Sequence, residues 1–127
     1  PSRQKAPSIP AGARAPAPVA VASAGLDPAF LPALAARLEK AERPVLILGG
    51  TGWTERSLNA LGGWAEKLGL PITLSFRRKD LIDNRHPCYI GDLGLGPNPK
   101  LIQRLKAADL VVTIGARLGE NPSQAYS

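Results

Sequence analysis

The residues of this chain best suited to binding chemistry are the glycines of the segment Gly50-Thr51-Gly52. They follow directly on the apolar run 44–48. Glycine lets the backbone turn tightly and approach a ligand closely, and a helix that follows would direct its free N–H groups and positive dipole end at a phosphate. The pattern begins a G-x-G-x-x-G fingerprint, but Glu55 replaces the last glycine. A tight strand-to-helix turn therefore remains an alternative to a phosphate site.

Arginine side chains at two further places could contact a phosphate. Arg117 follows Gly115-Ala116, at the end of an apolar run. The run 77–79 (Arg-Arg-Lys) is the densest positive cluster and could bind the 2′-phosphate of NADP or the acidic groups of a neighbouring domain. It is also compatible with a solvated loop whose charge is partly balanced by Asp80 and Asp83.

The reactive side chains form no recognisable catalytic set. His86 and Cys88 flank Pro87. A zinc site needs further ligands at usable spacing, and a Cys–His pair two residues apart in a turn has poor geometry, so a structural turn is the favoured interpretation. With neither a carboxylate pair nor a Ser-His-Asp grouping, we predict no catalytic residues and no metal ligands in this chain.

Length and composition are those of one small domain. The chain has 127 residues, of which 44% are hydrophobic and 5% aromatic, so its core would consist mainly of aliphatic side chains. No run approaches the roughly 20 apolar residues of a membrane span. The single cysteine excludes an internal disulfide and favours a reducing, cytoplasmic compartment.

The formal charge of +6 raises the possibility of nucleic-acid binding. Half of that charge comes from Arg3, Lys5 and Arg14, within a segment rich in proline, alanine and serine. Because no pattern of interleaved aromatic and basic residues accompanies the charge, nucleic acid is not an expected partner. Residues 1–25 instead have the composition of an interdomain linker.

Capping residues, prolines and glycines divide the rest of the chain into alternating helices and strands. Asp27-Pro28 suggests the N-cap of a first helix that extends to about Lys40. The run 44–48 predicts a strand buried on both faces. Thr54 is suited to cap a second helix, which Gly69 would end.

The second half of the chain repeats this alternation. Residues 71–75 predict a second strand, and the polar stretch 76–97 predicts a long, functional loop in which 89–90 form a short apolar anchor. Asn98-Pro99 precedes a third helix, and 109–115 predict a third buried strand. Such alternation predicts a parallel sheet whose ligand site lies beyond the carboxyl ends of the strands.

Several short motifs occur in a fixed order between residues 44 and 117. They are Pro44 to Gly52, Leu68-Gly69-Leu70-Pro71, the set Asp83, His86, Pro87, Tyr89 and Gly91, then Leu93-Gly94, Ala108 to Val111, and Gly115 to Arg117. In this order they resemble the central domain of thiamine-diphosphate-dependent enzymes of the acetolactate synthase type, over about residues 26–127.

The resemblance implies a Rossmann-like, three-layer α/β/α domain with a parallel sheet of six strands. On this basis residues 1–25 are the interdomain linker, and residues 26–127 are a partial central domain that is incomplete at its C-terminus. The implied parent enzyme is a homo-oligomeric decarboxylase or carboligase that acts on a 2-keto acid.

The resemblance also implies where the cofactors bind. Thiamine diphosphate and magnesium would lie between the pyrimidine-binding and diphosphate-binding domains, outside this chain. The central domain would be mainly structural and would bind FAD, ADP or neither. The residues that would line its nucleotide site are Gly49, Gly50, Gly52, Leu93, Gly94, Gly115, Ala116 and Arg117.

The alternative is an NADP-binding Rossmann domain of a reductase. It depends on the run 77–79 at the end of the second strand, where a Rossmann domain specific for NAD would carry an acidic residue instead.

Overall fold

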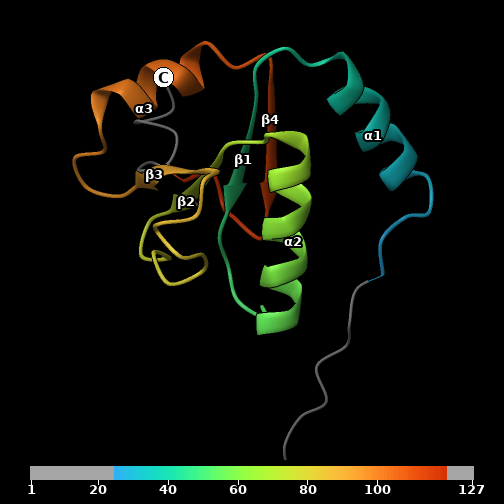
Figure 1. The fold of residues 1–127 in the computed structure, drawn as a ribbon, viewed down its shortest axis with the longest axis horizontal. Helices are drawn as coiled ribbons and strands as arrows, with labels where there is room; N and C mark the ends of the chain where they lie inside the picture. The colour runs from blue at the N-terminus through green and yellow to red at the C-terminus, as the bar shows by residue number, and fades with distance from the viewer. Residues whose placement is uncertain (1–24, 120–127) are drawn as a thin grey trace, which may run out of the picture.

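A four-stranded sheet with helices on both faces forms the part of the chain that the computed structural model describes, residues 25–119 (Figure 1). All but the last residue of the expected linker 1–25 lies outside the described residues. The elements in chain order are α1 (Phe30–Lys40), β1 (Pro44–Leu48), α2 (Glu55–Leu68), β2 (Ile72–Ser75), β3 (Tyr89–Leu93), α3 (Pro99–Lys106) and β4 (Leu110–Ile114).

The sheet is parallel throughout, with the strand order β3-β2-β1-β4. Strand β1 is central, and its residue Leu46 is in register with Ile72 of β2 and with Val112 of β4. The chain moves outward from β1 to β3 and then returns to the other side of β1. The change of direction between β1 and β4 is the topological switch point where open α/β sheets bind ligands.

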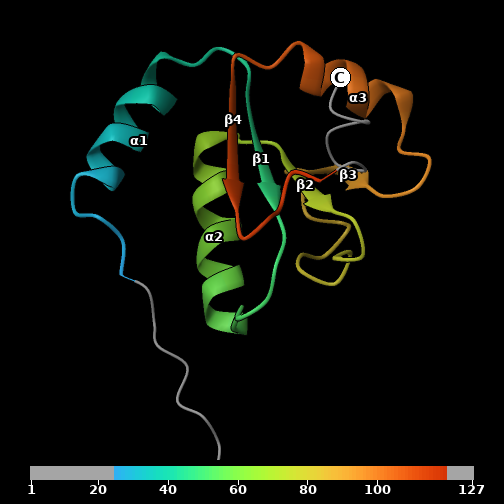
Figure 2. The same cartoon turned by 180° about the vertical axis from the view of Figure 1, so that it is seen from behind.

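The helices form two layers, one on each face of the sheet. Leu34 and Leu38 of α1 pack with α2 against the buried cluster of one face. Leu101 of α3 packs against Ile47 on the opposite face. Helix α2 lies in front of β4 in Figure 1 and behind it in Figure 2. The predicted Rossmann-like three-layer α/β/α class is therefore confirmed.

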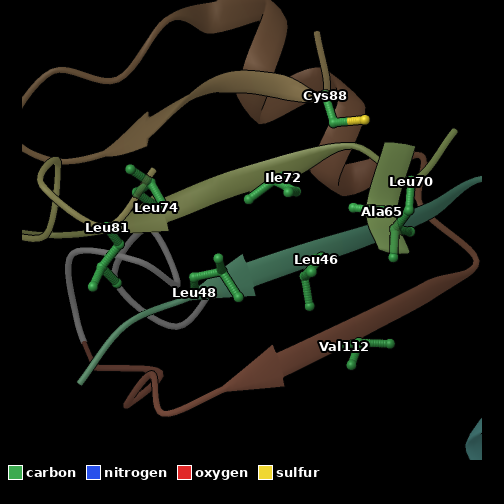
Figure 3. Close-up of a cluster of buried hydrophobic side chains, with 9 residues drawn as sticks. All are labelled: Leu46, Leu48, Ala65, Leu70, Ile72, Leu74, Leu81, Cys88 and Val112. Atoms are coloured by element: carbon green, nitrogen blue, oxygen red, sulfur yellow. The ribbon is translucent and has the colours of Figure 1, made fainter. Parts of the chain in front are cut away.

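The larger of the two buried clusters lies between the sheet and helices α1 and α2. Leu46, Leu48, Ile72 and Leu74 are fully buried, and Figure 3 shows them along the neighbouring strands β1 and β2, with Ala65 of α2 nearby. At about 25 cal/mol per Å² of buried apolar surface, each leucine or isoleucine contributes roughly 1.5–3 kcal/mol to folding. This aliphatic core fixes the strand ends at which the candidate site lies.

The predicted helix caps are confirmed for α2 and α3. Thr54 and Ser57 form a reciprocal capping box, in which the Ser57 N–H donates to the Thr54 hydroxyl at 3.1 Å. Gly69 ends α2 in the left-handed conformation with φ of 60°. Asn98 caps α3 through its side-chain oxygen, which accepts from the Lys100 N–H at 2.9 Å.

The predicted cap of α1 is wrong. Helix α1 begins at Phe30, and its N-cap, Ala29, has no capping side chain. Asp27 lies two residues before that cap. Its carboxylate accepts the Ala29 N–H at 2.9 Å, and its carbonyl accepts the Phe30 N–H at 2.9 Å. The aspartate therefore stabilises the turn that precedes the helix.

Two strand predictions also need correction. The stretch 76–97 is no continuous loop, because β3 pairs with β2 inside it. Gly91 and Asp92 disfavour a strand in the sequence, and Gly91, with φ of 122°, lies at the irregularity in the β2–β3 register. The third predicted strand is β4, but Val111 is 41% exposed because β4 is an edge strand in the described part of the sheet.

Candidate nucleotide-binding rim

The ends of the four parallel strands form a common edge, here called the carboxyl rim. Its residues are Gly49 to Gly52 after β1, Ser75 to Arg77 at β2, Leu93 and Gly94 at β3, and Gly115 to Arg117 after β4. All eight predicted nucleotide-binding residues lie on this rim. The sheet thus brings together segments that are more than 60 residues apart in the sequence.

Gly49 lies between the ends of the two strands that flank β1. A Cβ atom at this position would overlap the Ser75 hydroxyl and would lie 2.9 Å from the Ala116 Cα atom. The Gly49 N–H donates to the Ile114 carbonyl at 3.0 Å, which extends the β1–β4 ladder by one bond. Close packing across the rim therefore requires glycine at position 49.

Gly50 and Gly115 pack against each other in the same way. A Cβ atom at Gly50 would overlap the Gly115 carbonyl oxygen, and one at Gly115 would lie 2.6 Å from the Gly49 carbonyl oxygen. Both residues also have positive φ, 69° and 67°. These three glycines are thus explained by the approach of one strand-end turn to the other, whether or not a ligand binds.

Trp53 closes the inner side of this turn, a role that sequence reasoning missed. Its indole N–H donates to the Gly49 carbonyl at 2.7 Å, and its ring packs against the larger buried cluster. The sequence does contain a signal for this hydrogen bond, since a tryptophan follows directly on the glycine turn. A half-buried indole N–H usually needs a hydrogen-bond acceptor, and the turn carbonyls are the nearest ones in sequence.

Gly52 belongs to the open part of the rim. It has φ of 85°, and no atom lies within 4 Å of the position where a Cβ would be. The N-terminus of α2 follows, with Glu55 in its first turn. Because a carboxylate there offsets the positive end of the helix dipole, a phosphate at this point would have to compete with it.

The β3 side of the rim is partly closed by side chains. Leu93 is fully buried and packs in the second core cluster, so its side chain is unavailable to a ligand and only its backbone faces the rim. The Gly94 N–H donates to the Asp92 carboxylate at 3.1 Å. A Cβ at Gly94 would lie 2.6 Å from that carboxylate oxygen and 3.7 Å from the Phe76 ring.

Two of the three cations in the positive cluster 77–79 pair with carboxylates. Arg78 makes a bidentate pair with Asp80, at 3.0 and 3.1 Å, which lowers the pKa of that carboxyl group. Lys79 lies 3.1 Å from the Asp92 carboxylate. Arg117, the cation predicted to contact a phosphate, is exposed at the rim, and its side chain has no ion pair among residues 25–119.

His86 and Cys88 form the structural turn favoured by the sequence. The His86 Nδ1 atom accepts the Cys88 backbone N–H at 3.2 Å. Cys88 belongs to the larger buried cluster (Figure 3). Desolvation by burial raises the pKa of its thiol, and the nearby Glu66 charge raises it further. A raised thiol pKa disfavours the thiolate that nucleophilic chemistry needs.

The described residues do not fit a magnesium diphosphate site. Between residues 25 and 119, no three histidine, cysteine or carboxylate side chains are placed to hold a metal ion. The carboxylates of Asp80, Asp83 and Asp92 each pair with a cation of the same segment. The prediction that this chain supplies no metal ligands remains a prediction for the chain as a whole.

Residues 25–119 also form grooves that lie away from the rim. One of about 430 Å³ separates α1 from the end of α2 and is mainly aliphatic. A second, of about 360 Å³, lies between α1 and the exposed edge of β4. The third, of about 580 Å³, lies between α2 and residues 80–86 and includes four carboxylates. None of the predicted nucleotide-binding residues lines these grooves.

A parallel sheet with a topological switch point and helices on both faces defines a Rossmann-like α/β domain. The model of the family "Thiamine pyrophosphate enzyme, central domain" matches residues 31–127. The chain therefore belongs to this family, and the predicted family is confirmed.

Curated relatives agree with this assignment. Sulfoacetaldehyde acetyltransferase of Castellaniella defragrans is 34% identical over 89 residues, which are 70% of this chain and 15% of the relative. Acetolactate synthase isozyme 1 large subunit of Escherichia coli is 34% identical over 89 residues, with shares of 68% and 15%. The 3D-(3,5/4)-trihydroxycyclohexane-1,2-dione hydrolase of Geobacillus thermodenitrificans is 30% identical over 76 residues, with shares of 60% and 12%.

The aligned part of this chain thus spans about 15% of the length of the first two relatives. The three enzymes carry the names of an acetyltransferase, a synthase and a hydrolase. The family match does not favour the reductase alternative. Within residues 25–119, no helix combines the length and the apolar character that crossing a membrane requires.

Proposed function

We propose that this chain serves as the mainly structural central domain of an enzyme that makes or breaks a carbon–carbon bond next to a carbonyl group, commonly that of a 2-keto acid. The observation that carries the proposal is the match of residues 31–127 to the central-domain family. In agreement with it, no cluster of histidine, cysteine or carboxylate side chains that could hold a metal ion occurs among the described residues. The names of the relatives support the reaction class.

Thiamine diphosphate would supply the carbanion chemistry of the parent enzyme, with magnesium holding its diphosphate. In the proposal, the pyrimidine-binding and diphosphate-binding domains of the parent hold both groups in a cytoplasmic homo-oligomer. The contribution of this chain is to hold those domains apart at a fixed distance, for which a rigid aliphatic core is suited.

The rim is proposed to bind an adenine nucleotide, either ADP or the ADP portion of FAD. Gly49, Gly50 and Gly115 would form the closed floor of that site, because they pack on one another. The groups open to the nucleotide include the backbone around Gly52 and Gly94 and the side chain of Arg117.

A fluorescence titration tests the nucleotide proposal. Trp53 contacts Gly49, so its emission should change in a saturable manner when ADP or FAD binds at the rim. The control variant is Trp64→Phe, which removes the second tryptophan, located on α2. An emission change that is absent with both nucleotides, but present with NADPH, would contradict the proposal.

A kinetic assay tests the structural role. The purified 127-residue chain, supplied with thiamine diphosphate and magnesium, is expected to show no decarboxylation or carboligation of pyruvate. Turnover above the rate of the cofactor alone would show that the chain contains catalytic groups.

A further inference from the structure

The charged side chains between residues 77 and 92 leave one cation without an acidic partner. This stretch contains four arginine or lysine residues and three aspartates. Three ion pairs join them, Arg78 with Asp80, Lys79 with Asp92, and Arg85 with Asp83. Arg77 remains, and it has no ion pair among residues 25–119.

The backbone of Arg77 is held in an unfavourable conformation. With φ of 63°, Arg77 is the only residue other than glycine with positive φ in the described part of the chain. It occupies the third position of a turn closed by the Arg78 N–H and the Ser75 carbonyl, at 3.1 Å. Glycine or asparagine usually takes a turn position with positive φ, and such strain is concentrated at functional sites.

The guanidinium of Arg77 lies over an aromatic ring at the carboxyl rim. Its Cζ atom lies 5.0 Å from the centroid of the Phe76 ring, within the range of a cation–π interaction. The same ring is the neighbour of Gly94, one of the predicted nucleotide-binding residues. Stacking occupies a flat face of the guanidinium, so the N–H groups along its edge remain able to donate.

We propose that Arg77 is a phosphate-binding residue of the carboxyl rim, at the ends of β2 and β3. The inference deepens the proposed function, since the phosphate it would receive belongs to the nucleotide. The positive φ of Arg77 costs stability, and an interaction of its exposed guanidinium with an external anion gives that cost a function. Phosphate suits this side chain because a guanidinium edge matches two phosphate oxygens.

The decisive variant is Arg77→Gly, because its thermal stability should rise while its affinity for phosphate falls. Glycine adopts positive φ without strain, so the Tm should rise by about 3 °C. Loss of the charged donor should weaken binding of inorganic pyrophosphate by about 10-fold or more, measured by calorimetry at low salt. Arg77→Ala should weaken binding similarly without the gain in Tm.

The matched control is Arg85→Gly. Arg85 belongs to the same stretch, is 91% exposed and has an acidic partner in Asp83. Its removal should leave pyrophosphate affinity within about twofold of the unmodified chain, because Arg85 lies outside the carboxyl rim, its charge is already offset by Asp83, and exposed charges interact weakly in water.

Parallel titrations with ADP separate this inference from the proposed function. If the unmodified chain binds pyrophosphate through Arg77 but does not bind ADP, the inference holds and the nucleotide proposal fails. If the unmodified chain binds no pyrophosphate, or if Arg77→Gly binds it as tightly as the unmodified chain, the inference is wrong.

Discussion

Gly50 and Gly115 lie against each other across the switch point of the sheet, so that a Cβ atom on Gly50 would overlap the Gly115 carbonyl oxygen. The two residues are 65 positions apart, and the pairing of β1 with β4 brings them together. The contact gives the glycine-rich turn a packing role. It also divides the rim into a closed floor and an open outer part.

The variant Gly50→Ala should be strongly destabilised. The new methyl group would overlap backbone atoms, and the backbone would keep a φ of 69°, so the loss should be on the order of 3 kcal/mol. Urea unfolding followed by circular dichroism measures this loss.

The matched control for this variant is Gly52→Ala. Its φ of 85° is also positive, but the space around it is open, so only the conformational cost of roughly 1–2 kcal/mol is expected. Equal losses in the two variants would show that backbone packing at Gly50 is unimportant.

The adjacent glycines in the middle of α2 should respond differently to alanine. Nothing lies within 4 Å of a Cβ at Gly63, so Gly63→Ala should stabilise the domain by about 0.5–1 kcal/mol through helix propensity. At Gly62 the new Cβ would lie 3.3 Å from the His86 Nε2 atom, so this contact should offset the gain. Thermal unfolding of both variants provides the comparison, and a larger gain at Gly62 would disprove this packing argument.

Stability should fall in acid partly through Asp109. Its carboxylate accepts the backbone N–H groups of Glu42 and Arg43, at 2.7 and 2.9 Å, and these bonds lower its pKa, with the Glu42 bond the larger cause. Because the folded-state pKa lies below the unfolded-state value, the stabilisation is complete above the unfolded pKa of about 3.9 and is lost as the pH falls through the folded pKa.

The variant Asp109→Asn isolates this contribution. Asparagine keeps one acceptor but loses the charge, so its Tm should be lower at pH 7, and the difference from the unmodified chain should shrink toward pH 2–3. Scanning calorimetry between pH 2 and pH 7 provides the measurement. A difference that stays constant across this range would mean that the Asp109 charge does not stabilise the fold.

The sequence was sufficient for the features that depend on local chemistry. Thr54, Gly69 and Asn98 mark helix ends because a cap depends on only a few neighbouring residues. Strand β3 was missed because Gly91 and Asp92 disfavour a strand locally, and pairing with β2 supplies its stability. The edge position of β4 likewise depends on the strand order, which local patterns do not encode.

The candidate site likewise combines features that the sequence predicts with features that depend on packing. The placement of eight residues on one rim follows from parallel strands and could be predicted. The contact of Gly49 with Ser75 and Ala116, the hydrogen bond from Trp53, and the stack of Arg77 on Phe76 depend on three-dimensional packing. These contacts, which the sequence did not reveal, determine which part of the rim remains open.

The most direct test of the account is an NMR titration of the isotope-labelled chain with ADP. If the carboxyl rim is a nucleotide site, the largest amide shifts should occur at Gly52, Gly94 and Arg117, with little change in α1. Shifts confined to the groove between α2 and residues 80–86, or no saturable shift up to millimolar ADP, would contradict it.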